Sequence, residues 1–212
     1  MVVAKFLVAV AGLVMSVSGF AHNTDSTNSI DCDFTGMDLD SAISRMLAKI
    51  PAYEEKVGDT YRHTLAGIAF IGINMTGMNK LIQYGPAIRY CVNGTRMVQV
   101  DLVNDGDVKI SVPWKSCEGS TGTIYLTADF SRFTTQLRVK ENGFGEVSFS
   151  NEGPVYPVST EEIKLRITGA GMHVMMAANY LSLIFPGFLR EMWNDQFFYY
   201  AYMSIVDAIV SQ

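Results

Sequence analysis

The feature that most constrains the fold is a long stretch in which apolar and polar residues alternate at period two. Between about residues 62 and 170, segments such as Met97–Leu102, Val108–Val112 and Ile163–Ile167 place apolar side chains on one face and polar ones on the other. Such alternation is typical of antiparallel strands whose sheet has one buried and one solvated face. We therefore predict an antiparallel meander of about six or seven strands, whose apolar face other elements must cover.

Turn residues divide this stretch. Asn104-Asp105-Gly106 predicts a hairpin, and Asn142-Gly143 predicts a further turn. The segment Gly153–Pro157 is expected to interrupt strand pairing, and the apolar run Leu65–Ile73, which contains two glycines, is expected to be a strand with bulges. Nothing resembles a strand–helix–strand repeat, so a parallel nucleotide-binding sheet is not expected.

Helical periodicity flanks the meander on both sides. Asp38 or Asp40 is expected to cap a first helix that Pro51 ends. From Met172 the period is again helical, Pro186-Gly187 predicts a break, and the remainder is apolar nearly all round, which is typical of a buried helix. The predicted fold class is therefore α+β, with an amphipathic N-terminal helix and a long apolar C-terminal helix as the only candidates to cover the sheet.

The first 21 residues predict a secretory signal peptide. Lys5 is their only charged residue, Phe6–Val17 is largely apolar, and Gly19 and Ala21 supply the small residues of a cleavage site. The apolar segment is too short for a membrane span. We expect a signal peptide at 1–21, a flexible polar leader at 22–37 and a single domain at 38–212, in a secreted, extracellular protein.

Secretion permits disulfides and glycans. Of the three cysteines, Cys91 and Cys117 are expected to pair, because they flank a predicted local hairpin. Cys32 is left either free or paired between chains. Asn74 and Asn93 begin N-x-S/T triplets and are candidate glycosylation sites.

Charge and motifs exclude several functions. A net charge of −5 without basic runs argues against nucleic-acid binding and against polybasic docking to membranes. His173, Asn179, Pro186 and Arg190-Glu191 oppose stable membrane insertion of the C-terminal segment. No nucleophile or zinc motif surrounds the three histidines, so we predict neither catalysis nor a metal site nor a cofactor.

Twelve methionines are an unusual supply of flexible apolar side chains. They either line an adaptable cavity or fill the core, and periodicity does not separate these readings. The methionines in question are Met46, Met75, Met78, Met97, Met172, Met175, Met176, Met192 and Met203.

Several segments, together with the order of the predicted elements, carry a resemblance to known proteins: Gly77–Leu81, Val112–Cys117, Ile163–Gly171, Phe185-Pro186 and Glu191–Trp193. The layout resembles the single-domain tubular lipid-binding proteins of arthropods. It is most similar to the mite group 7 allergens, and more distantly to takeout and juvenile-hormone-binding proteins and to the halves of bactericidal/permeability-increasing protein. Takeout-like proteins have a disulfide near the N-terminus, whereas Cys32 has no partner close by in the sequence.

The resemblance implies a curved sheet rolled around the helices with an apolar groove for a lipid-like ligand, and for some members a role in innate immunity or host interaction. The expected lining residues are Ile43, Leu47, Ile68, Phe70, Met78, Met176, Tyr180, Ile184, Trp193 and Phe197. One alternative is a secreted interaction protein with a fully packed core and a protein partner. Another is a lipocalin-like carrier, which predicts a short C-terminal helix.

Overall fold

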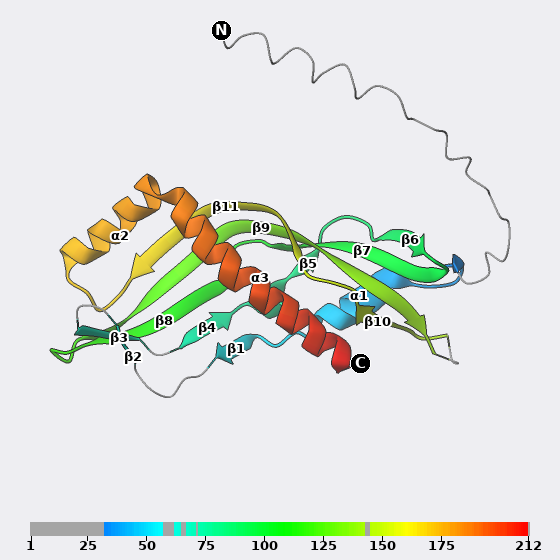
Figure 1. Ribbon diagram of the computed structural model, residues 1–212, viewed down its shortest axis with the longest axis horizontal. Coiled ribbons are helices and arrows are strands. Elements are labelled where there is room, and N and C mark those ends of the chain that lie inside the picture. The colour runs from blue at the N-terminus through cyan, green and yellow to red at the C-terminus, as the bar shows by residue number, and fades with distance from the viewer. Residues whose placement is uncertain (1–31, 57–61, 65–66, 71, 143–144, 212) are drawn as a thin grey trace, which may run out of the picture.

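The computed structural model is an α+β fold built on an 11-stranded antiparallel sheet (Figure 1). It describes residues 32–56, 62–64, 67–70, 72–142 and 145–211, so the predicted signal peptide and most of the predicted leader lie outside the described residues. The helices are α1 (Leu39–Leu47), α2 (Met172–Ile184) and α3 (Pro186–Val210), with a short 3-10 helix at Met78–Lys80. The strands are β1 (Tyr53–Lys56), β2 (Arg62–Thr64), β3 (Ile68–Phe70), β4 (Ile73–Thr76), β5 (Ile82–Gln83), β6 (Ile88–Val92), β7 (Thr95–Asn104), β8 (Lys109–Ser116), β9 (Thr121–Glu141), β10 (Val147–Asn151) and β11 (Tyr156–Ile167).

The central strand β9 has 21 residues and is paired on both edges. β8 and then β7 follow one edge, and β11 and then β10 follow the other, all antiparallel to β9. Strands that are antiparallel to the same strand on the same edge run in the same direction. The strands predicted between residues 97 and 167 are therefore pieces of three long arms, 95–116, 121–141 and 147–167, and the remaining strands are short additions at the edges.

The hairpin predicted at Asn104-Asp105-Gly106 is wrong. β7 and β8 do not pair with each other; the register of β7 on β9 (Asn104 opposite Ser131) continues on β8 (Lys109 opposite Thr127) with one extra residue. We call this one-residue bulge between β7 and β8 the jog. The buried Asn104 side chain stabilises it, since its Oδ1 accepts from Val108 N at 2.9 Å and its Nδ2 donates to Ala128 O at 3.4 Å. Gly77, at φ 88°, packs so closely on the jog that a Cβ there would lie 2.3 Å from Asp107 O.

The jog also changes which residues of β9 face the core. Even-numbered residues are buried before it (Leu126, Ala128) and odd-numbered residues after it (Phe133, Leu137). One unmatched residue reverses the two faces of a strand, because side chains alternate at period two. In the 95–116 arm, the even-numbered residues face the same side before and after the jog. Both halves of the three-armed sheet therefore present apolar side chains to the same side. The interruption predicted at Gly153–Pro157 is confirmed only for residues 152–155, which separate two strands that both pair with β9. Tyr156 and Pro157 already belong to β11 and pair with β9.

Helix α1 begins as predicted. Asp38 is its N-cap and accepts from Ser41 N at 3.0 Å and from Ser41 Oγ at 2.6 Å, and these hydrogen bonds hold the pKa of Asp38 below its ordinary value. Its buried face comprises Leu39, Ala42, Ile43, Met46 and Leu47. The stretch after Pro51 forms strand β1, which pairs with β4.

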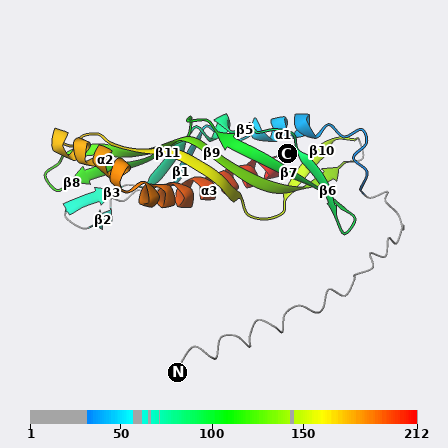
Figure 2. The same ribbon diagram turned by 90° about the horizontal axis from the view of Figure 1, so that it is seen from above.

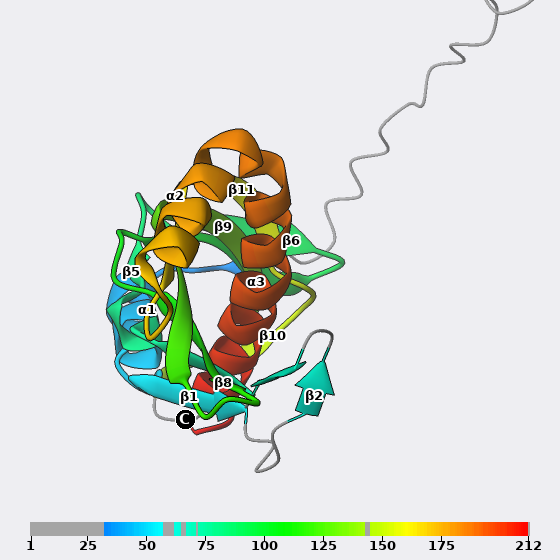
Figure 3. The ribbon, with the colours of Figure 1, turned by 90° about the vertical axis from the view of Figure 1, so that its left-hand side faces the viewer.

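Helix α3 lies along the inner face of the sheet and fills the centre of the core. Trp193 stacks on Phe197 with ring centroids 5.1 Å apart, and Phe133 of β9 meets Phe197 edge-on at 5.8 Å. The buried Trp193 Nε1 donates to Ser131 Oγ at 3.0 Å, so its polar atom is satisfied inside the apolar layer. Figure 3, viewed along the long axis, shows the strands curving around α3. The predicted covering of the sheet by α1 and α3 is confirmed.

Helix α2 is different from α3. Pro186 starts α3 as predicted, and the axes of α2 and α3 meet at 93°. α2 is apolar nearly all round, yet Ala178 is the one fully buried side chain among those described on it. Within the described part of the chain, no single helix is long and apolar enough to cross a membrane. Figure 2 shows α1 and α2 at opposite ends of the elongated body.

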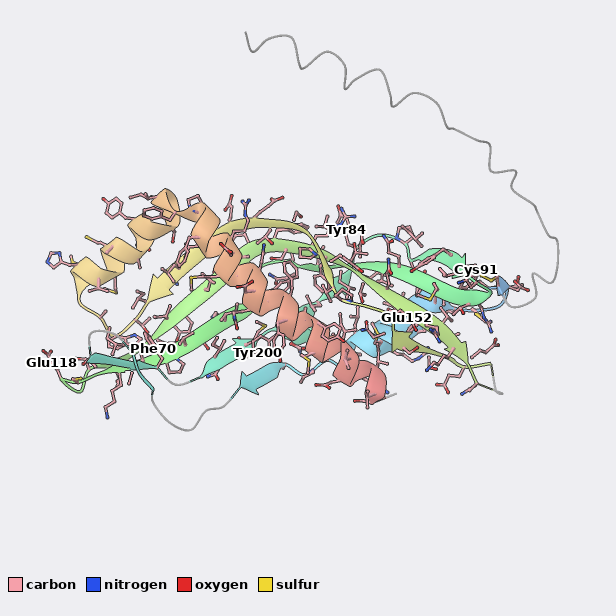
Figure 4. The ribbon with its side chains drawn as sticks, in the orientation of Figure 1. Phe70, Tyr84, Cys91, Glu118, Glu152 and Tyr200 are labelled. Atoms are coloured by element: carbon pink, nitrogen blue, oxygen red, sulfur yellow. A yellow bond between two sulfur atoms is a disulfide. The ribbon has the colours of Figure 1, made fainter. Side chains whose placement is uncertain are left out.

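The disulfide differs from the predicted Cys91–Cys117 bridge. Cys91 pairs with Cys32, with Cα atoms 6.0 Å apart, and Cys117 is free and exposed. Because β7 and β8 form one arm instead of a hairpin, Cys91 and Cys117 lie beside its two ends, roughly 60–70 Å of extended strand apart. Figure 4 shows Cys91 at one end of the molecule and Glu118, the neighbour of Cys117, at the other.

The bridge attaches the end of the predicted leader to the domain. Within residues 32–37, Asp33 accepts from Thr35 N at 2.8 Å in a turn, and Met37 is buried in the core. The two predicted glycan acceptors differ in exposure. Asn93 is exposed in the β6–β7 turn at φ 50°, whereas Asn74 is half-buried in β4. Glycan occupancy at both positions stays a prediction.

A partly buried ion pair joins β7 to β9 on the outer face. Asp101 accepts from Arg132 Nε at 3.1 Å and from Thr134 Oγ1 at 2.6 Å, and Arg132 lies over the Tyr84 ring at 4.7 Å. Burial acts to raise the pKa of Asp101, but the hydrogen bonds from Thr134 and Arg132 outweigh it and hold that pKa below its ordinary value.

We predict that Cys32→Ser or Cys91→Ser lowers the free energy of unfolding by about 4 kcal/mol, from the loop-closure entropy of a 59-residue separation. Denaturant melts measure the loss. Cys117→Ser is the matched control and should melt like the wild type. A non-reducing peptide map that links Cys91 to Cys117 would contradict the pairing.

We predict that Asp101 stabilises the fold above its unfolded pKa of about 3.9 and that this stabilisation, about 1 kcal/mol or less, is lost as the pH falls through the lower folded value. Asp101→Asn and Arg132→Gln should each flatten the fall in urea midpoint between about pH 5 and pH 2. If the urea midpoint of both variants fell with decreasing pH as steeply as that of the wild type, this role would be contradicted.

Candidate functional site

An apolar cavity of about 190 Å³ lies at the α2 end of the molecule, between the inner face of the sheet and the start of α2. Among the described residues, its lining comes from β3, β8, β9, β11 and the corner that leads into α2. The lining residues are Ile68, Phe70, Trp114, Ile124, Ile167, Ala170 and Val174.

Cross-strand pairing assembles this floor. Phe70 on β3 is opposite Trp114 on β8, Trp114 is opposite Gly122 on β9, and Ile124 is opposite Ile167 on β11. Opposite residues on one face of a sheet have Cβ atoms about 5 Å apart. Residues from four distant parts of the sequence therefore form one continuous apolar surface.

Gly122 makes room for this surface. A Cβ at residue 122 would lie 2.8 Å from Trp114 Cε2 and 1.9 Å from Thr168 O, closer than atoms approach without moving the backbone. The absence of a side chain lets the Trp114 indole lie against β9 and lets the end of β11 approach the same point. Trp114 is buried, and its Nε1 has no hydrogen-bond partner among the described residues.

Helix α2 packs against β11 over the cavity. Ser182 Oγ accepts from Leu165 N of β11 at 3.2 Å and donates to Ala178 O at 3.2 Å, which ties one face of the helix to the sheet. The other faces of α2 are exposed, although they carry Met175, Met176 and Tyr180. The cavity is thus roofed by a helix whose apolar surface continues from the lining into solvent.

The ten predicted lining residues fall into three groups. Ile68 and Phe70 line the cavity. Met176, Tyr180 and Ile184 are exposed on α2. The other five, Ile43, Leu47, Met78, Trp193 and Phe197, are buried in the packed core, so the structure brings them together as core and not as cavity lining.

Sequence reasoning missed Trp114, Ile124, Ile167, Ala170 and Val174 as lining residues. The alternation did place Ile124 and Ile167 on the apolar face, but the position of α2 over them depends on the corner at Gly169, where φ is 76°. Of the nine methionines considered above, Met46, Met75, Met78 and Met97 are buried, and Met172, Met175, Met176 and Met192 are exposed. None of the nine lines this cavity.

Three further hollows, each lined by described residues, are more polar or more open. One of about 360 Å³ is lined by Arg45, Lys49 and Lys140 beside α1, and one of about 620 Å³ lies over Val155 and Tyr202. A third, of about 320 Å³, lies between β11 and the α2–α3 bend. Within the described residues, no group of three or more His, Cys, Asp and Glu side chains is arranged to hold a metal ion.

No family model matches the chain, and no curated protein matches it. Among solved structures, the crystal structure of Takeout 1 from Epiphyas postvittana aligns over 82% of this chain and 91% of that chain, at 11% identity and a TM-score of 0.42. A TM-score below 0.5 does not by itself establish that the two chains share a fold or a role. The α+β fold therefore rests on the structure itself, and the resemblance to group 7 allergens and other tubular lipid-binding proteins stays a prediction.

We predict that Gly122→Ala forces the Trp114 indole or the end of β11 to move, which destabilises the fold by about 2 kcal/mol or more and changes the Trp114 fluorescence. Thermal melts and emission spectra measure both effects. Gly171→Ala is the matched control, because a Cβ there meets nothing within 4 Å. Equal stability of the two variants would contradict the close approach at Gly122.

Proposed function

We propose that this protein is a secreted, non-enzymatic binder or carrier of a hydrophobic, lipid-like ligand. The observation that supports the proposal is the apolar cavity under α2, together with the exposed apolar surface of α2 that continues from it. An empty apolar cavity of about 150 Å³ is large enough for a benzene-sized molecule. The 190 Å³ here suits one end of a longer ligand.

The rest of such a ligand would extend from the cavity along α2. Val174 lines the cavity and is itself 49% exposed, so it stands at the mouth. Met175 and Met176 follow it in the exposed part of the helix. Methionine side chains adapt their shape to irregular apolar ligands, which suits a carrier with a loosely defined hydrophobic tail.

The lining argues for binding rather than chemistry. None of the seven lining residues is an acid, a base or a nucleophile, and an ion pair on the same strands, Asp129 with Lys164, is exposed. A hydrogen bond from Lys164 holds the pKa of the Asp129 carboxyl below its ordinary value, so this carboxylate is a stable partner in an ion pair. We therefore place no catalytic role on the described residues.

A second candidate is a secreted interaction protein without a small ligand. The close packing of Trp193, Phe197 and Phe133 and the exposed apolar face of α2 favour it. A lipocalin-like carrier is disfavoured, because it predicts a short C-terminal helix and α3 has 25 residues. A role in innate immunity or host interaction stays a prediction of the family resemblance.

We predict that Val174→Glu weakens uptake of a fluorescent fatty acid about tenfold, because it places a charge at the mouth of an apolar cavity. Fluorescence titration of the protein purified from a eukaryotic secretion host measures the affinity. Val210→Glu is the matched control: it makes the same change at an exposed helical valine at the far end of α3 and should bind like the wild type.

Native mass spectrometry of the same preparation separates the two candidates. Co-purifying lipid in stoichiometric amount, reduced in Val174→Glu, supports a carrier. A wild-type protein that carries no lipid and takes up no fatty acid overturns the carrier and favours the interaction protein.

A further inference from the structure

The bend between α2 and α3 exposes the most concentrated apolar surface among the described residues. Tyr180, Leu183, Ile184, Phe185 and Phe188, which we call the elbow, are each between 54% and 77% exposed. No Asp, Glu, Lys or Arg occurs from residue 167 to residue 189. Soluble proteins rarely leave such a patch bare without a partner for it.

The course of the backbone keeps the elbow away from the sheet. Pro186 is at the N-terminus of α3, where its missing N–H costs no hydrogen bond, and the two helix axes diverge by 93° there. Ser182 ties the preceding turn of α2 to Leu165 of β11, so the elbow cannot fold back onto the sheet without breaking that contact. Figure 1 shows the bend standing above the sheet at the α2 end.

Cations border the apolar surface. Arg190 and Lys164 line the shallow hollow beneath the elbow together with Leu183 and Pro186; Glu162 is also there, 3.8 Å from Lys164. Lys164 is paired with Asp129, whereas exposed Arg190 has no ion pair among the described residues. An apolar tip with an arginine one turn behind it matches the order of acyl chains and phosphates in a lipid layer.

The elbow alone is smaller than the interface of a stable dimer. At about 200 Å² for a whole aromatic or large aliphatic side chain, the exposed parts of the elbow amount to roughly 600 Å². A standard stable dimer buries about 800 Å² on each partner, with polar contacts around an apolar centre. A peripheral anchor needs only an uncharged apolar tip that enters the boundary of the layer by about 5–10 Å.

We propose that the elbow is a peripheral membrane anchor, which inserts its apolar side chains into the interface of a phospholipid layer while Arg190 contacts the lipid phosphates. The anchor is distinct from the cavity, since Tyr180, the elbow residue nearest to it in the helix, lies six residues, about 9 Å of helix, beyond Val174. It is also distinct from a membrane span, because the insertion stops at the headgroup boundary and the sheet stays in water.

Flotation with large unilamellar phosphatidylcholine vesicles tests the anchor. The wild-type full chain should float with the vesicles, and Leu183→Asp/Phe188→Asp should reduce the floating fraction at least about tenfold. The matched control is Val158→Asp/Val210→Asp, which makes the same change at two exposed valines outside the elbow and should float like the wild type. Circular dichroism melts show that each variant is folded.

A second measurement does not depend on loss of binding. Phe188→Trp adds an indole at the tip, while the natural Trp114 and Trp193 are buried. Brominated-chain phosphatidylcholine should quench the added emission and leave the natural emission unchanged. Absence of flotation and quenching overturns the proposal, as does a wild-type dimer in ultracentrifugation that Leu183→Asp/Phe188→Asp converts to a monomer.

The outcome is separable from the proposed carrier function. Val174→Glu should float normally, and Leu183→Asp/Phe188→Asp should keep its affinity for a fluorescent fatty acid added in solution. Loss of flotation without loss of fatty-acid binding supports an anchor separate from the ligand site. Loss of both in the elbow variant would show that the two surfaces are one, and would overturn a separate anchor.

Discussion

Strand β9 organises the fold, because other strands pair along both of its edges. Because β7 and β8 share one edge of this 21-residue strand and β10 and β11 share the other, the chain forms a ribbon of three long arms instead of a compact stack of short hairpins. A ribbon of that length, about 70 Å if extended, has two separate ends. The disulfide lies at one end and the apolar cavity at the other.

A long twisted ribbon with one apolar face needs a long cover. Helix α3 supplies it with Trp193, Phe197 and their neighbours, and α1 closes the end near the disulfide. At the other end the cover is α2, which packs on β11 with the side that carries Ala178 and Ser182 and leaves most of its apolar surface in solvent. Incomplete cover at one end is the physical origin of both the cavity and the elbow.

Much of the fold could be predicted because its signals are local. The cap at Asp38, the helix break at Pro186 and the alternation of Leu137 and Val139 with their polar neighbours each depend on a few adjacent residues. The errors arose where a local signal had two outcomes. Asn104-Asp105-Gly106 has the residues of a hairpin turn, but the buried Asn104 side chain hydrogen-bonds to Val108 and Ala128, and the chain continues in the same direction from β7 into β8. The misassigned disulfide followed from that error, because the hairpin was the reason to place Cys91 near Cys117.

The candidate site was less predictable than the fold. Ile68 and Phe70 were identified, but Trp193 and Phe197 have the same apolar character and periodicity as a lining and are packed core. Residue order alone was sufficient to identify the two helical ends of the chain, the apolar faces of the long strands and the charge-free stretch from 167 to 189. Which apolar residues are covered emerged only in the packed fold, because burial depends on what packs opposite a side chain, and here that was set by the jog at Asn104, the gap at Gly122 and the bend at Pro186.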